Sequence, residues 1–228
     1  PFKKIGTSSI ALGGGDYLTA PSSSDWVFSG DFTVETWIYK ITNNGGDNAL
    51  MFAYGGDQGG WGNTGWIFRL NGNNQISFQQ NNGSGGTGFT LNASTALSND
   101  TWHHVAIVKS GTSYKLYLNG TEDGSTTGSN PVQNLGHRLT IGADYIDTAS
   151  TRLKAGSYMD EIRISDTARY TANFTPSTTA FTTDANTKLL IHGDDAMGSV
   201  SRTSSAGRWA GNGTSHATFS GNNIKVTT

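Results

Sequence analysis

The sequence predicts an all-β protein that folds as a two-sheet antiparallel β-sandwich. Gly, Ser, Thr and Asn make up nearly half of the 228 residues, and these types favour turns and strand surfaces over helices. Only 14% of the residues are charged, against roughly 25% in ordinary soluble domains. Short apolar segments recur between the Gly- and Asn-rich stretches, which is typical of two packed sheets. A helical bundle and a doubly wound α/β enzyme are therefore disfavoured.

The clearest predicted strand is Phe32–Tyr39, because its residues alternate between two faces. Val34 and Ile38 share one face, and Glu35 and Trp37 share the other. Short apolar runs bounded by turn-forming residues predict the next strands in the same way. These strands are Ala49–Tyr54, Trp66–Leu70 and Gln75–Gln80.

Trp102–Lys109 and Tyr114–Leu118 form the next predicted pair of strands, and Asn119-Gly120 after them is a hairpin turn signal. One later segment, Asp166–Thr171, has a helical pattern, and it predicts a short helix. The remaining predicted strands are Leu139–Gly142, Tyr158–Ser165 and Lys188–His192.

Two regions follow from this pattern, and they predict one domain. Residues 1–193 contain all the clear strands. Residues 194–228 begin with a Ser- and Gly-rich loop and end in two short apolar pieces, Ala217–Phe219 and Ile224–Val226, which predict a final hairpin. These last strands either complete the same domain or exchange with a neighbouring subunit, because alone they are too small to hold a core.

Composition also argues against several classes of partner. The net charge is −2, and Lys and Arg are scattered singly, so no nucleic-acid partner is expected. No apolar run approaches the ~18 residues of a membrane-spanning helix, so no membrane insertion is expected. The chain has no Cys, which removes disulfides and zinc–thiolate sites.

A set of short phrases keeps a common order and spacing over about residues 8–193. They are Gly15–Leu18, Pro21–Trp26, Gly30–Ile38, Trp102–Ala106, Leu116–Gly120, Ile141-Gly142 and Met159–Ser165. In these phrases the chain resembles the concanavalin A-like lectin/glucanase superfamily, particularly its laminin-G-like members. The resemblance implies a β-jelly roll of two antiparallel sheets, one of them concave, over residues 1–193. It also implies that Glu161 and Arg163 form a pair on the sheet surface.

A narrower likeness concerns Ala168–Tyr170, Asn173–Pro176 and Thr187–His192. These phrases look like a version of the family that is frequent in bacteriophage virion proteins and bacterial surface proteins. The likeness implies a structural protein of the virion surface, either a capsid decoration or a tail or fibre component. Its partners would be other virion proteins or further copies of the same chain.

The acidic residues do not match a glycosidase, so no catalytic residue is assigned. Hydrolysis of glycosides needs two carboxylates at a fixed separation, and the chain has only three Glu, at positions 35, 122 and 161. The Glu-x-Asp-x-x-Glu strand of the superfamily's glucanases is missing. Adjacent His103 and His104 point to opposite faces of a strand, so a structural role is expected for them rather than joint metal binding.

A calcium site is one hypothesis. Asp47-Asn48 precedes a predicted strand, and Asp144 and Asp147 follow another. This looks like the pentraxin arrangement, in which an Asp-Asn pair and an acidic loop bind calcium through oxygen ligands. The spacing of the acidic loop differs here, and it contains no Glu. The alternative is that these residues form Asx turns at the ends of loops.

A sugar site is the second hypothesis, and it lies in the loop between Tyr54 and Trp66. Glycines flank Trp61 closely, so its indole has little local cover. An exposed ring beside amides and carboxylates can stack on the apolar face of a sugar while the polar groups bind its hydroxyls. The predicted ligand-binding residues are Tyr54, Asp57, Gln58, Trp61 and Asn63. The alternative is that Trp61 is buried on the sheet or against another subunit.

Two function classes remain open. The first is a non-enzymatic structural protein of the virion surface, with capacity to bind glycan. The second is a calcium-dependent carbohydrate-binding lectin or adhesin of a bacterial surface, which would be extracellular. The likeness to virion proteins makes the virion surface the expected location. The chain opens with Pro1-Phe2-Lys3-Lys4 and no apolar signal segment follows, which disfavours the bacterial surface, although that location stays open if the chain is a fragment.

Overall fold

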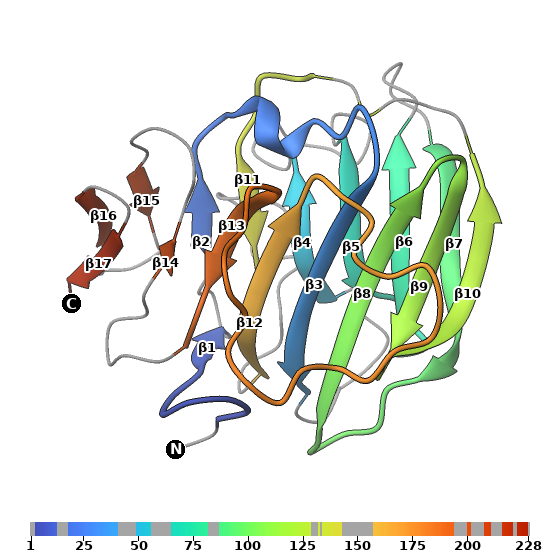
Figure 1. Ribbon diagram of the computed structural model, residues 1–228, viewed down its shortest axis with the longest axis horizontal. Coiled ribbons are helices and arrows are strands. Elements are labelled where there is room, and N and C mark those ends of the chain that lie inside the picture. Colours follow the sequence, from blue (N-terminus) through green and yellow to red (C-terminus); the bar gives the residue numbers. More distant parts are fainter. Residues whose placement is uncertain are drawn as a thin grey trace.

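The computed structural model describes residues 3–12, 18–40, 49–55, 65–81, 87–128, 132, 134–142, 157–193, 200–201, 208–210, 216–220 and 223–227. In this part of the chain, two antiparallel β-sheets pack face to face (Figure 1). The described helical structure is one 3-10 turn, η1 (Ser24–Trp26). The predicted two-sheet sandwich is therefore confirmed. No helix among the described residues is long and apolar enough to cross a membrane.

The larger sheet is called sheet A. Its strands, in spatial order, are β10 (Thr121–Thr127), β9 (Ser113–Leu118), β8 (Trp102–Ser110), β3 (Phe32–Tyr39), β12 (Ser157–Ser165), β13 (Thr187–Ile191), β14 (Val200–Ser201), β17 (Asn223–Thr227), β16 (His216–Ser220) and β15 (Arg208–Ala210). The short strand β1 (Ile10–Leu12) also pairs with β12. The predicted C-terminal hairpin is present, because β16 and β17 pair antiparallel.

The smaller sheet is called sheet B. In spatial order it contains β2 (Leu18–Ala20), β11 (Leu139–Ile141), β4 (Ala49–Tyr54), β5 (Trp66–Leu70), β6 (Gln75–Asn81) and β7 (Thr87–Ala96). The predicted strands agree with the observed ones to within about one residue at each end. The strands that the sequence did not indicate include β7 and the edge strand β10.

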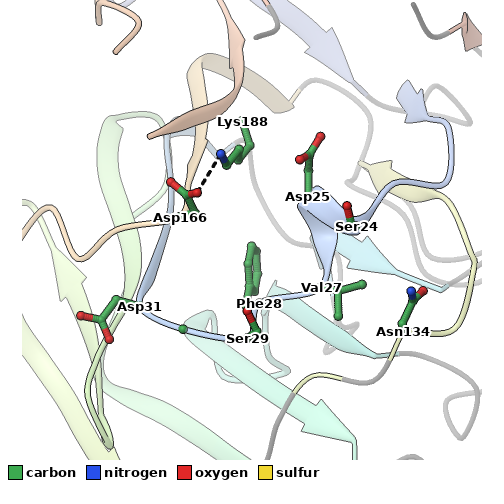
Figure 2. A pocket seen from close by; sticks show the side chains of 10 residues that line it. Ser24, Asp25, Val27, Phe28, Ser29, Asp31, Asn134, Asp166 and Lys188 are labelled. Carbon is green, nitrogen blue, oxygen red and sulfur yellow. Dashed lines mark ion pairs between the residues drawn. The ribbon is translucent and has the colours of Figure 1, made fainter. Parts of the chain in front are cut away.

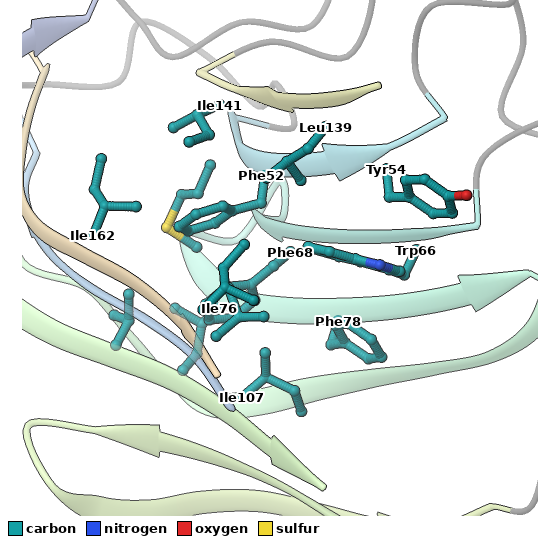
Figure 3. Packing of buried hydrophobic residues seen from close by; sticks show 14 of the residues in the cluster. Phe52, Tyr54, Trp66, Phe68, Ile76, Phe78, Ile107, Leu139, Ile141 and Ile162 are labelled. Carbon is teal, nitrogen blue, oxygen red and sulfur yellow. The ribbon is translucent and has the colours of Figure 1, made fainter. Parts of the chain in front are cut away.

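The hydrophobic core fills the space between the sheets (Figure 3). The predicted alternation in β3 is confirmed, since Val34 and Ile38 point into this core. From sheet B, Trp66 and Phe68 are fully buried and face them. Burying an aliphatic side chain stabilises a fold by roughly 1.5–3 kcal/mol, so the central strands are fixed by these residues.

A long segment without regular structure, residues 166–186, is called the strap. It crosses the outer face of sheet A (Figure 1), where Tyr170 and Phe174 pack on Tyr117. The helix predicted at Asp166–Thr171 is wrong. The backbone of this segment bonds to β3 instead, because Thr33 Oγ1 donates to the Thr167 carbonyl at 2.8 Å and accepts from the Arg169 N–H at 3.0 Å.

A buried ionic cluster lies under the strap and is centred on Glu35. Its carboxylate accepts hydrogen bonds from Arg163 Nε at 2.8 Å and from the Tyr170 hydroxyl at 2.8 Å, and it lies 3.1 Å from His104 Nε2. Burial by itself would raise the pKa of Glu35, but the bonds and charges of His104 and Arg163 outweigh it and hold that pKa below its ordinary value. His103 bonds elsewhere, to Ser98 and Asn119, so the structural role predicted for both histidines is confirmed.

The pairing predicted between Glu161 and Arg163 is wrong. Glu161 lies at a β-bulge with a positive φ of 50°, which takes its side chain away from Arg163. Its fully buried carboxylate bonds instead to His192 Nδ1 at 2.7 Å and accepts from the Phe181 N–H at 2.6 Å. Arg163 pairs with Glu35. The bulge therefore separates the two charges and gives each a different partner.

Candidate functional site

An open cavity of about 520 Å³ lies at the end of the sandwich near η1 (Figure 2). Four separate parts of the chain supply its lining: the segment from η1 to the start of β3, the loop before β11, the first residue of the strap, and the start of β13. The lining residues are Ser24, Asp25, Val27, Phe28, Ser29, Gly30, Asp31, Asn134, Asp166 and Lys188. Ligand pockets commonly have volumes of roughly 300–1,000 Å³, so a small polar ligand fits here.

The turn η1 positions Asp25. Ser23 caps the turn, since its hydroxyl accepts from the Asp25 N–H at 3.2 Å and donates to the Asp25 carboxylate at 2.8 Å. Trp26 then anchors the turn in the core, because its side chain is fully buried and its carbonyl accepts from Trp66 Nε1 at 2.9 Å. Asp25 is therefore held at the cavity by a neighbour on each side.

Phe28 provides the apolar part of the lining. It stacks on Phe32 with ring centroids 4.1 Å apart and on Trp66 with centroids 5.1 Å apart. Figure 2 shows its ring in the middle of the lining, with the polar side chains around it. Phe28 is 6% exposed and belongs to the core cluster, so it forms the buried apolar floor of the cavity.

Asp31 and Gly30 form the wall beside the hairpin of β8 and β9. Asp31 Oδ1 accepts from the Gly111 N–H at 2.7 Å, and Lys109 Nζ donates to the Gly30 carbonyl at 3.3 Å. A Cβ added at Gly30 would meet no atom within 4 Å. This glycine therefore opens directly into the cavity, and a larger side chain there would occupy it.

The fourth part of the lining is an ion pair. Lys188 Nζ lies 2.7 Å from Asp166 Oδ2, with side chains 23% and 47% exposed. Asp166 begins the strap and Lys188 follows its end, so the ion pair lies at the base of the strap, where its two ends meet. Arg169 joins the two ends by donating two hydrogen bonds to the Asp184 carboxylate. Those hydrogen bonds hold the pKa of Asp184 well below its ordinary value, so this carboxylate stays charged and keeps the base of the strap in place.

Tyr54 is the member of the predicted sugar site that the structure describes. Its side chain is fully buried and belongs to the core cluster. The hydroxyl accepts from the Leu135 N–H at 3.1 Å and lies 3.5 Å from Asn134 Oδ1. Tyr54 thus supports the loop that carries Asn134 into the end cavity, rather than presenting its ring to solvent.

The other predicted site residues lie outside the described residues. These are Asp57, Gln58, Trp61 and Asn63 of the sugar site, and Asp47, Asn48, Asp144 and Asp147 of the calcium site. Both sites therefore remain predictions. Within the described part of the chain, no group of three or more His, Cys, Asp or Glu could hold a metal ion.

The sequence did not point to the end cavity as a site. Residues 21–26 and 30–38 stood out as family phrases only, and Asn134, Asp166 and Lys188 are far from them in the chain. Each lining residue alone is an ordinary loop or strand-end residue. Only the folded chain brings them together.

A scan against protein-family models matches residues 12–174 to the concanavalin A-like lectin/glucanases superfamily. A search of curated proteins found no significant match.

Solved structures with a similar fold include a Bacteroides ovatus protein described as a candidate carbohydrate binding protein. It matches with a TM-score of 0.68 and 16% identity, over 99% of this chain and 60% of that one. The chain thus spans about three fifths of the length of that relative. The K499G mutant of NanB sialidase from Streptococcus pneumoniae matches with a TM-score of 0.54 and 14% identity, over 97% of this chain and 38% of that one.

A further similar structure is the CBM40 of the Ruminococcus gnavus IT-sialidase. It has a TM-score of 0.53 and 13% identity, over 74% of this chain and 95% of that one. At these identities the likeness shows the fold alone. It places the chain among two-sheet sandwiches that occur both as separate domains and as parts of larger proteins.

Proposed function

Because the chain belongs to the concanavalin A-like lectin/glucanases superfamily, we propose that it is a non-enzymatic carbohydrate-binding domain and that it binds glycan in the end cavity. The observation that carries the proposal is the lining of this cavity, in which hydroxyl, amide and carboxylate groups lie around an apolar floor. A sugar presents the matching chemistry, because its hydroxyls can bond to these polar groups.

The placement of the glutamates supports a binding role over hydrolysis. Glu35 and Glu161 are fully buried and bonded to protein groups. Glu122 lies on the edge strand β10 and pairs with Lys115 Nζ at 2.7 Å. None of the three lines the end cavity. The carbohydrate-binding descriptions of similar folds in Bacteroides ovatus and Ruminococcus gnavus agree with this role.

The proposal is tested by a substitution whose side chain fills the cavity. Gly30→Leu places a side chain where the structure has open space, so the protein folds while the cavity is occupied. Thr178→Leu adds a similar side chain on the exposed strap, away from the lining, and is the matched control. On a glycan array we expect the wild type and Thr178→Leu to bind the same glycans and Gly30→Leu to lose them. An array with no signal for the wild type contradicts the proposal.

The loop residues Asp57, Gln58, Trp61 and Asn63 are proposed as a second contact region for the same glycan. The reason is that the Trp61 indole is expected to be exposed between glycines, next to side chains that can bond sugar hydroxyls. The variant Trp61→Ala tests the contribution of this loop independently of the cavity. If the loop contributes, the array signal falls in Trp61→Ala while the melting temperature stays unchanged. An unchanged signal removes the loop from the proposal.

Calcium is proposed to bind Asp47, Asn48, Asp144 and Asp147. Their carboxylate and amide oxygens are the kind of ligand that calcium prefers. Isothermal titration with calcium is the direct test, with Asp47→Ala as the comparison. Heat in the wild type that disappears in Asp47→Ala supports the site, and no heat in the wild type ends the hypothesis.

The proposed setting is the virion surface, where the domain serves as a structural protein that also binds glycan. The support is the resemblance of Ala168–Tyr170, Asn173–Pro176 and Thr187–His192 to virion proteins; the strap residues among them cover the outer face of sheet A. The alternative setting is a bacterial surface. Co-purification with a capsid or tail supports the first, and recovery with the cell envelope supports the second.

A further inference from the structure

The strap covers a small apolar cluster on the outer face of sheet A (Figure 1). Ala106, Val108 and Tyr117 form the buried part of this cluster, and Tyr170 and Phe174 of the strap pack against it. The cluster is separate from the core between the two sheets. Movement of the strap away from the sheet would therefore uncover apolar surface and leave the main core intact.

Two polar atoms beneath the strap reduce the stability of this contact. His104 Nδ1 and the Tyr117 hydroxyl are buried, and neither has a hydrogen-bond partner among the described residues. The Phe174 ring of the strap covers both, with its centroid 5.6 Å from that of His104 and 5.4 Å from that of Tyr117. A buried polar atom without a partner costs free energy. Water reaches both atoms when the strap lifts, and this gain offsets part of the apolar contact that is lost.

The carboxylate of Glu35 holds the strap over the cluster. Its charged and titratable neighbours come from three elements: His104 Nε2 from β8 at 3.1 Å, Arg163 Nε from β12 at 2.8 Å, and the Tyr170 hydroxyl of the strap at 2.8 Å. Arg163 also contacts the strap directly, because its guanidinium donates to the Tyr170 hydroxyl at 3.4 Å and lies 4.0 Å from the Phe181 ring centroid. Arg163 is therefore enclosed between Glu35 and the strap.

A second buried glutamate holds the strap further along. Glu161 accepts from the Phe181 N–H at 2.6 Å and lies 2.7 Å from His192 Nδ1. Asp160, the preceding residue, accepts instead from the N–H groups of the N-terminal segment. This attachment of Phe181 does not involve Glu35.

The base of the strap is attached independently as well. Arg169 donates two hydrogen bonds to the Asp184 carboxylate. These bonds hold the pKa of Asp184 well below its ordinary value, so this attachment persists in acid. Residues 170–180 lie between the base and Phe181, and they are the part of the strap that depends on Glu35.

Loss of the negative charge on Glu35 would leave Arg163 without its counter-charge. The guanidinium keeps its positive charge at every pH, and Arg163 is only 8% exposed. A buried cation without a partner is strongly unfavourable, and the strap keeps water away from this one. Lifting the strap hydrates Arg163 at a smaller loss of contact than unfolding the sandwich, because the main core stays packed.

We propose that the strap is an acid-sensitive cover: when Glu35 takes up a proton, residues 170–180 lift from sheet A and expose Tyr117 while the sandwich stays folded. This inference concerns the outer face of sheet A and does not depend on the proposed carbohydrate binding.

The direction of the pH dependence follows from the neighbours of Glu35. Burial raises the pKa of Glu35, but the bonds and charges of His104 and Arg163 outweigh it and hold that pKa below its ordinary value of 4.5. The closed strap is therefore favoured above pH 4.5, and opening increases as the pH falls from there toward the folded pKa.

Hydrogen–deuterium exchange of the full chain, read by mass spectrometry and corrected for the intrinsic exchange rate, tests the inference without a substitution. The Phe174 N–H, which bonds the Gly120 carbonyl at 2.9 Å, reports on the strap, and the N–H groups of β3 and β8 report on the sandwich. Because one proton is taken up, protection of residues 170–180 should fall by up to about ten-fold per pH unit below 4.5. Protection in β3 and β8 should stay constant. Strap protection that does not change with pH, or that is lost together with that of β3 and β8, overturns the inference.

The variant Glu35→Gln imitates the protonated carboxyl at neutral pH. We expect residues 170–180 to lose protection already at neutral pH and to show no further change in acid. Glu122→Gln is the matched control, because Glu122 also lies beside the strap, where its N–H donates to Asn173 Oδ1, but its carboxylate pairs with the half-buried Lys115. This control should keep the protection and the pH dependence of the wild type. If the two variants behave alike, the inference is wrong.

A milder variant, Tyr170→Phe, keeps the ring and removes only its hydroxyl bond to Glu35. It provides the same test if Glu35→Gln does not fold. Protection of residues 170–180 at neutral pH should fall by about five-fold, the effect of one hydrogen bond, and that of β3 should not change. Equal strap protection in Tyr170→Phe and the wild type would also overturn the inference.

Discussion

Asp160 is a single side chain that ties together three distant parts of the chain. Its fully buried carboxylate accepts from the N–H groups of Ile5 at 3.0 Å, Glu161 at 2.9 Å and Gly193 at 3.2 Å, and also from that of Lys4 at 3.2 Å. Burial raises the pKa of Asp160, and these N–H groups oppose the rise. The residue therefore connects the N-terminal segment, the bulge of β12 and the end of β13.

Replacing Asp160 is expected to be costly, because several buried N–H groups lose their acceptor at once. A buried unsatisfied donor costs about 1–3 kcal/mol, so Asp160→Ala should lower the free energy of unfolding by at least about 3 kcal/mol. Urea denaturation measures the loss. Asp123→Ala, which removes exposed hydrogen bonds to Thr95, is the control and should cost less than about 1 kcal/mol. Equal losses would contradict a special role for Asp160.

Glu35 predicts how stability depends on pH. Its pKa in the folded protein is held below the ordinary value of 4.5, so its contribution to stability is present above that value. It is lost as the pH falls through the folded pKa. Urea midpoints measured from neutral to acid pH should therefore decline below about pH 4.5.

Glu35→Gln isolates this contribution from that of Asp160, whose raised pKa acts in the opposite direction. The variant leaves Arg163 buried without its counter-charge, which costs about 3–5 kcal/mol at neutral pH. The difference in stability between wild type and variant should shrink as the pH falls below 4.5. If the difference in the free energy of unfolding does not change with pH, the pKa of Glu35 is not lowered by folding.

The hairpin between β9 and β10 supports the strap. Asn119 and Gly120 both have positive φ, of 52° and 81°, as a tight hairpin turn requires. The Phe174 N–H donates to the Gly120 carbonyl at 2.9 Å. A Cβ at Gly120 would collide with the Phe174 carbonyl, so only glycine lets the strap approach here.

Gly120→Ala is expected to destabilise the protein more than Gly111→Ala. Both glycines have positive φ, of 81° and 58°, but a Cβ at Gly111 meets nothing within 4 Å. Gly111→Ala should therefore cost only the backbone strain, roughly 1–2 kcal/mol. Gly120→Ala adds the collision, and we expect a further ~1–3 kcal/mol and faster proteolysis of the strap. If the two variants lose the same free energy of unfolding, the strap must shift to make room for the added Cβ at Gly120.

The elements that the sequence predicts well are those with a clear periodic pattern. In β3, Val34 and Ile38 enter the core and Glu35 does not, as the alternation indicates. The edge strand β10 shows no such pattern, because its residues are half-buried or exposed throughout. The strap was predicted in part as a helix, since the sequence cannot reveal that Thr33 competes for its backbone bonds.

The candidate site was harder to predict than the fold for a similar reason. Tyr54 is a residue type that often contacts sugars, but its position in the alternation of β4 directs its side chain into the core. The end cavity depends on Asp31, Asn134 and Lys188, which only the folded chain brings together. A sequence shows which residue types lie close together along the chain. A site assembled from four segments can be found only when the topology is known.

Residues 194–228 remain predicted either to complete the domain or to exchange with a neighbour. Strand β14 pairs with β13, with Leu190 opposite Ser201, and this pairing defines what a truncation would remove. We therefore expect a chain cut after Gly193 to melt at a lower temperature, because β13 loses its neighbour.

The same truncated chain should keep the subunit number of the full chain in equilibrium sedimentation. A smaller assembly after truncation would instead indicate strand exchange between subunits. A melting temperature equal to that of the full chain would contradict completion of the domain. The two measurements therefore distinguish the alternatives.

The outer edge of sheet A has a consequence for many copies held close together. On β10 the register shifts between Glu122 and Gly124, and Glu122 and Asp123 place charge along the edge. Bulges and charges of this kind prevent one sheet from adding to the next. This edge of sheet A therefore resists pairing with the sheet edge of a neighbouring copy.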